Sequence, residues 1–200
     1  MARDQGECRR VELPGGRSLT VRPMVPADAD GLVALFAAFG EDDLYARFFT
    51  AHPPPVQLVE RMVRVGGRGG AGLVAVVGAA RGEVVAEVSY EPLGNGDGEL
   101  GIAVARAWRG WLGPYLLDAL LAAAARAGVG NLEADVLVAN RPMLALLRAR
   151  GHAVIRHDEG PATVRVVVGT HGAAPSWPAG SDRPRLLVEA PGRWPAEAAA

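Results

Sequence analysis

Half of the 200 residues are hydrophobic, the net charge is −1 and Cys8 is the one cysteine. We expect a soluble, cytoplasmic globular protein, because this length and composition can bury one core and no run of about 18 apolar residues could span a membrane. The near-neutral charge argues against a nucleic-acid partner, and the absence of clustered Cys and His residues argues against a metal site.

The first part of the chain predicts a strand followed by a helical layer. Residues 1–17 are polar with a Pro-Gly-Gly turn, and we interpret them as a flexible N-terminal segment. Alternating apolar residues predict a strand over 19–23, so the domain begins at residue 18. Three predicted helices follow: one capped by Asp28 and ended by Gly40, one over 42–49, and one over 56–65.

The second part predicts an antiparallel meander and then alternating strands and helices. The strands are predicted at 73–77, 84–90, 99–105, 132–138, around 154, and at 164–168; the helices at 116–127 and 142–150. This order predicts an α/β (α+β mixed) domain over 18–168, with one mixed sheet and helices on both faces. Residues 169–200 are rich in Pro, Gly and Ala, which predicts a disordered tail.

The turn between strand 99–105 and the following helix is a candidate phosphate site. It contains Trp108, Arg109, Gly110, Trp111, Leu112 and Gly113. Backbone N–H groups at a helix N-terminus bind anions, and glycine lets the backbone approach a ligand closely. The same pattern also serves as a plain tight connection, so the turn alone leaves both interpretations open.

Several segments in the right order resemble the GNAT superfamily of acyl-CoA-dependent N-acyltransferases. They are the strand with Glu99, the turn to Gly113, the Leu116-Leu117 pair and residues 134–151. That last stretch and residues 44–49 are similar to the bacterial protein-lysine acetyltransferase branch. The resemblance implies a mixed, mostly antiparallel central sheet of about six to seven strands, and acetyl-CoA as acyl donor.

The resemblance also implies where the donor binds. The thioester would meet backbone of Ile102, Ala103 and Val104, and the pyrophosphate would meet the turn from Arg109 through Gly110, Trp111 and Leu112 to Gly113. Asn140 would contact the pantetheine arm, although a helix N-cap explains it equally well. The turn departs from the family pattern, because Trp111 stands where a glycine is usual or else the loop is one residue short.

Glu99 matches the family's general base, which would take a proton from the attacking amine. A carboxylate at the solvent-exposed start of a strand is the competing interpretation, and Glu87 is the substitute if Glu99 faces solvent. Helical spacing favours core packing for Tyr45, Arg47 and the phenylalanines after them, with a lip of the acceptor site as the second interpretation. Under that second interpretation, Tyr45 and Arg47 bind substrate.

The leading hypothesis is an N-acetyltransferase that transfers an acetyl group from acetyl-CoA to an amine, with a protein lysine as acceptor. A second hypothesis is a degenerate GNAT module that senses acyl-CoA or binds proteins, favoured by the altered turn and by Leu146 and Leu147 where many relatives carry a catalytic tyrosine. A third is a small-amine acetyltransferase. We expect a monomer or a homodimer.

Overall fold

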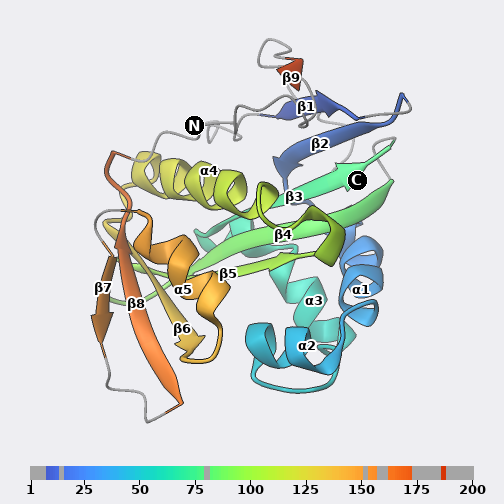
Figure 1. Cartoon of the computed structure of the whole chain (residues 1–200). Helices are drawn as coiled ribbons and strands as arrows, with labels where there is room; N and C mark the ends of the chain where they lie inside the picture. The colour runs from blue at the N-terminus through green and yellow to red at the C-terminus, as the bar shows by residue number, and fades with distance from the viewer. Residues whose placement is uncertain are drawn as a thin grey trace.

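The computed structural model describes residues 8–13, 16–78, 82–150, 153–156, 162–172 and 186–187. Within these residues, nine strands form one sheet in the order β7-β8-β6-β5-β4-β3-β2-β1-β9 (Figure 1). The strands are β1 (Arg9–Glu12), β2 (Ser18–Pro23), β3 (Ala71–Val77), β4 (Glu83–Pro92), β5 (Gly98–Val104), β6 (Asn131–Leu137), β7 (Ala153–Arg156), β8 (Thr163–Gly169) and β9 (Leu186–Leu187).

Five α-helices and three short 3-10 turns connect the described strands. They are η1 (Pro26–Asp28), α1 (Ala29–Ala37), α2 (Glu41–Phe48), α3 (Val56–Met62), η2 (Val65–Arg68), η3 (Arg106–Trp108), α4 (Leu112–Arg126) and α5 (Arg141–Arg148). Helix α4 begins at Leu112, before the predicted 116, and Pro114 lies in its first turn, where the missing N–H costs the helix little. None of the helices in the described part of the chain has the length and apolar character needed to cross a membrane.

The predicted mixed, mostly antiparallel sheet is confirmed. Strands β5 and β6 pair in parallel, and the other neighbouring strands pair antiparallel. Strands β2 to β8 are the seven that the family resemblance implies, while β1 and β9 extend one edge of the sheet.

The predicted domain limits, 18 and 168, remain predictions. Residues 9–12 form a strand within the segment predicted to be flexible, because Val11 is fully buried and pairs with Leu19. Residues 1–7 and most of 169–200 lie outside the described residues, and so do the predictions made for them.

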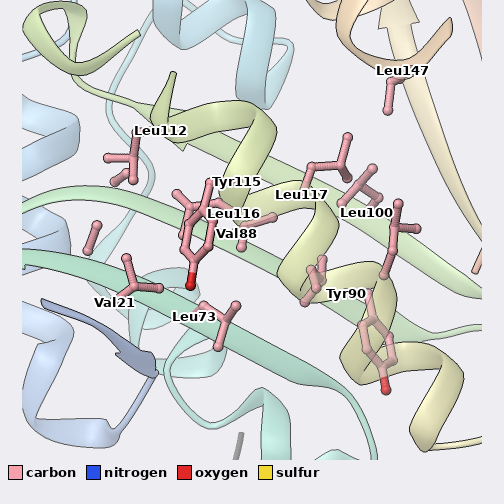
Figure 2. Packing of buried hydrophobic residues seen from close by; sticks show 14 of the residues in the cluster. Val21, Leu73, Val88, Tyr90, Leu100, Leu112, Tyr115, Leu116, Leu117 and Leu147 are labelled. Carbon is pink, nitrogen blue, oxygen red and sulfur yellow. The ribbon is translucent and has the colours of Figure 1, made fainter. Parts of the chain in front are cut away.

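Helices cover the central strands on both faces, as predicted. In β3, Leu73 and Ala75 belong to a large core with α4 and α5, whereas Val74 and Val76 belong to a smaller core with α1, α2 and α3. Figure 2 shows α4 residues, among them Leu112, Leu116 and Leu117, packed with strand residues of the large core. Strand β4 is therefore buried at every position from 84 to 90, whereas β6 alternates between buried and partly exposed residues.

Candidate active site

Strands β5 and β6 separate immediately after they pair. Their parallel register consists of Gly98 with Leu132 and Glu99 with Glu133. On the other edge of β5 the antiparallel register with β4 continues through Val104, and the N–H of Ala105 donates to Val85 O at 2.8 Å. The sheet therefore opens beside the second half of β5.

The direction of the β5 backbone groups follows from this register. Because Ala105 donates toward β4, alternate residues such as Ala103 also direct their N–H and C=O groups toward β4. Ile102 and Val104 direct theirs toward the opening. Of the three residues predicted to meet a thioester, Ile102 and Val104 thus present backbone groups at the opening, and Ala103 instead buries its side chain in the smaller core.

The turn after β5 has the backbone geometry of a close-approach loop. Gly110 is exposed and has a φ of 92°, a conformation that favours glycine. Trp108 and Trp111 pack edge to face, with ring centroids 5.8 Å apart, and both contact the large core. The bulk of Trp111, which departs from the family pattern, is therefore directed at the core. Leu112 and Gly113 begin α4, where backbone N–H groups lack an acceptor within the helix.

Arg109 connects this turn to α2. Its Nε donates to Val104 O at 3.0 Å, and its Nη2 lies 2.9 Å from Asp43 Oδ2. The side chains of Arg109 and Asp43 are 43% and 35% exposed, so solvent screens the pair and a stronger anion could compete for the guanidinium.

Asn140 is the N-cap of α5. Its side-chain oxygen accepts a hydrogen bond from the N–H of Met143 at 3.2 Å. The capping interpretation of Asn140 is confirmed, and contact with a pantetheine arm stays a prediction.

The other face of β5 carries Glu99, Gly101 and Ala103 on the side of α1, α2 and α3. Directly opposite residues of antiparallel strands point to the same face, so Glu91 on β4 lies beside Glu99. Glu99 is exposed to solvent, and Glu91 forms ion pairs with Arg61 and Arg68 at 2.9 and 2.7 Å. The exposure of Glu99 matches the competing interpretation, a carboxylate at the solvent-exposed start of a strand, and its role as a base stays a prediction.

Glu87, the substitute base, is fully buried on the same face of β4. Its Oε1 accepts from Arg47 Nε at 3.0 Å, and its Oε2 accepts from Ser89 Oγ at 3.4 Å. Burial raises the pKa of Glu87, and the charge and hydrogen bond of Arg47 offset this only in part. Because the Glu87 carboxylate is ion-paired and inaccessible, we interpret it as the group that holds Arg47 in place and not as the base that takes a proton from substrate.

Helix α2 corrects the packing predicted for its aromatic residues. Tyr45 and Phe49 are 48% and 43% exposed and contact each other edge to face, so core packing was wrong for them. Phe48 instead packs on Phe36 of the smaller core. Phe49 is exposed because the turn ending α2 places it in the left-handed region, with a φ of 56°, outside the helical period. Tyr45 lies within the helix, beside the face that Leu44 and Phe48 turn toward the smaller core.

The sequence model of the acetyltransferase (GNAT) domain matches residues 18–152, most of the chain. The chain belongs to the GNAT acetyltransferase family. The likeness to the bacterial protein-lysine acetyltransferase branch is also confirmed, by relatives named Pat.

This GNAT chain is 27% identical over 161 residues to acetyltransferase Pat of Mycolicibacterium smegmatis, covering 79% of the chain and 48% of Pat. It thus spans about half the length of that relative. The GNAT domain of S. lividans PAT superposes with a TM-score of 0.70 and 26% identity, covering 81% of this chain and 96% of that domain. The yncA protein of Salmonella typhimurium, a structure with its cofactor acetyl-CoA, shares the fold at a TM-score of 0.61 and 18% identity, covering 79% and 98%.

The sequence does not predict one feature of this GNAT site, the contact between the Arg47 guanidinium and the β5 backbone at Gly101. A Cβ at Gly101 would lie 2.6 Å from Arg47 Cζ and 2.8 Å from Nη1, so the guanidinium rests against the β5 backbone. The available signal was a glutamate within the apolar strand Val84–Tyr90, since a buried carboxylate needs a partner. Its partner lies 40 residues away in sequence.

Proposed function

We propose that this chain is an acetyl-CoA-dependent N-acetyltransferase with a protein lysine as acceptor and Glu99 as general base. The observation that carries this proposal is that the backbone groups and the Glu99 side chain of β5 point to different sides of the strand. Backbone groups of Ile102 and Val104 meet the opening next to the Gly110 turn, while the side chain of Glu99 lies on the face covered by α2. Donor and acceptor can therefore approach β5 from different sides.

The donor side has groups that suit an acyl-CoA. The pyrophosphate would take N–H groups at the start of α4, the exposed Gly110 backbone and the Arg109 guanidinium, which favours phosphate through bidentate contacts. The acetyl-CoA bound to the yncA protein, which shares this fold, supports the same ligand here. Pro114 lacks an N–H, so the first turn of α4 offers one donor fewer.

The acceptor side has the group that the chemistry requires. An amine attacks a thioester only when neutral, so a carboxylate must take a proton from the ammonium directly or through water. The nitrogen then forms a bond to the carbonyl carbon, a backbone N–H of Ile102 or Val104 stabilises the oxyanion, and the C–S bond breaks to release CoA as its thiolate. Glu99 is accessible for the proton transfer, whereas Glu87 is committed to Arg47.

Calorimetric titration with acetyl-CoA, followed by a thiol-release assay with a lysine peptide, tests the proposal. We expect binding, and we expect Glu99→Gln to lower turnover by roughly 10²–10⁴-fold without weakening acetyl-CoA binding. Glu133→Gln is the matched control, since Glu133 is the register partner of Glu99 on β6.

Three results would contradict parts of this proposal. No binding at millimolar acetyl-CoA would favour the degenerate module. The altered turn and the buried Leu147 are the features that favour this alternative. Full turnover by Glu99→Gln would remove Glu99 as the base. Turnover of spermidine in preference to a lysine peptide would favour the small-amine hypothesis.

A further inference from the structure

Arg47 has more hydrogen-bond donors than its surroundings use. Its side chain is only 19% exposed, and its Nε donates to Glu87. A guanidinium has five N–H donors, and the described residues provide no hydrogen-bond acceptor for the four on the Nη atoms of Arg47. Because the side chain is partly exposed, water can satisfy these donors in the free protein, and a ligand oxygen can take the place of that water.

Three neighbours fix the position of these donors. Glu87 holds Nε, the Phe48 ring centroid lies 4.8 Å from Cζ, and the backbone at Gly101 supports the guanidinium where any side chain would collide with it. Ser89, the register partner of Gly101, donates to the second oxygen of Glu87 and so fixes the carboxylate. The Nη groups are therefore pre-positioned for a ligand.

The charge balance selects the kind of oxygen that fits. The carboxylate of Glu87 offsets the guanidinium charge, which reduces the attraction for a second carboxylate and the repulsion of a cationic amine. A neutral carbonyl oxygen, which needs donors but no net positive charge, suits such a pair.

The location selects the acceptor as the source of that oxygen. Gly101 lies two residues after Glu99, about 7 Å along the strand at roughly 3.4 Å per residue, and on the same face of β5. The groups proposed to meet the donor, in contrast, are backbone groups at the edge facing β6. An oxygen bound over Gly101 thus belongs to the molecule whose amine reaches Glu99.

We propose that the Nη groups of Arg47 bind a carbonyl oxygen of the acceptor, so that the preferred acceptors are amines carrying an amide carbonyl, as a lysine within a peptide does. Polyamines and alkylamines lack this oxygen. The inference rests on the proposed function and specifies its acceptor. Glu87 is a positioning residue, because it acts through Arg47.

The test compares two probes by calorimetry on the full chain: Nα-acetyl-lysine methylamide and 1-aminopentane, which presents an amine without a carbonyl. We expect the amide probe to bind about tenfold or more tightly, as one charge-assisted hydrogen bond provides. Arg47→Gln should abolish this preference by weakening the amide probe alone. Arg64→Gln, at an exposed arginine after α3, should change neither affinity.

The outcomes separate the possible roles of Arg47. Equal binding of the two probes to the unmodified protein, or equal weakening of both by Arg47→Gln, would overturn the inference and assign Arg47 a structural role. Weakened acetyl-CoA binding with unchanged probe binding would place the oxygen on the donor and overturn it too.

A second variant controls for misfolding, and a separate assay tests the proposed function independently of this inference. Arg47→Lys keeps a cation beside Glu87 but lacks the paired Nη groups, so it should fold and still lose the preference. Probe binding through Arg47 in a protein that releases no CoA thiol would refute the proposed function while the inference holds.

Discussion

The two sides of β5 differ in how closely their parts are packed. At Gly101 an added Cβ would collide with the Arg47 guanidinium, whereas at Gly113 the nearest atoms to an added Cβ are 3.9 Å away, on Leu146 and Val104. The acceptor side therefore depends on one arrangement of side chains, while the turn into α4 has space for an added methyl group at Gly113. Departures from the family pattern matter less in the turn than a substitution beneath Arg47 would.

The largest expected effect tests this contrast directly. Gly101→Ala should push the flexible end of Arg47 away from β5 and weaken its charge-assisted hydrogen bond to the buried Glu87, which lowers the free energy of unfolding by about 2 kcal/mol. Gly113→Ala should change it by less than about 1 kcal/mol, in the stabilising direction, because alanine favours a helix more than glycine does. Urea unfolding of both variants measures the difference, and equal effects would show that the two sides are packed alike.

The pH dependence of stability examines the acceptor side alone. Because the pKa of Glu87 is raised above its ordinary 4.5 in the folded protein, the folded state binds protons more tightly than the unfolded state. The contribution of Glu87 to stability is then fully present below pH 4.5 and is lost as the pH rises through the folded-state pKa.

Glu87→Gln removes this titration. We expect the stability of the unmodified protein, measured relative to Glu87→Gln, to fall as the pH rises, by at most about 1.4 kcal/mol for each pH unit. Thermal unfolding of both proteins from pH 4 upward provides the measurement, with the exposed Glu60→Gln as a control for general charge effects. A difference that grows in the opposite direction would mean that Arg47 lowers the pKa of Glu87 more than burial raises it.

The smallest effect concerns the connection between the two sides. Asp43→Asn should free Arg109 for the pyrophosphate and tighten acetyl-CoA binding a few-fold, while stability changes by less than about 1 kcal/mol, since the pair is half-exposed. Asp42→Asn is the matched control, because Asp42 is exposed and precedes Asp43 in the first turn of α2. Weaker acetyl-CoA binding in Asp43→Asn would instead mean that Asp43 orients Arg109 for the ligand.

Much of the fold and part of the site were predictable from the sequence. The order of strands and helices, the mixed, mostly antiparallel sheet and the N-cap at Asn140 follow from periodicity, caps and family resemblance. The exposure of Phe49 was not, because helical spacing continues through Phe49 in the sequence while the backbone leaves the helix there. Nor was the exposure of Tyr45, because which face of α2 meets the core is decided by the packing of Leu44 and Phe48.

The sequence by itself determined the elements and the family, because periodicity, capping and turn residues act between neighbours along the chain. Only the tertiary structure decided that Glu87 pairs with Arg47, that Gly101 seats the guanidinium, and that Ile102 rather than Ala103 faces the opening. Those facts depend on register and on contacts between residues up to 54 positions apart, from Arg47 to Gly101. Local patterns do not encode such contacts, since burial and pairing arise only when the strands and helices pack together.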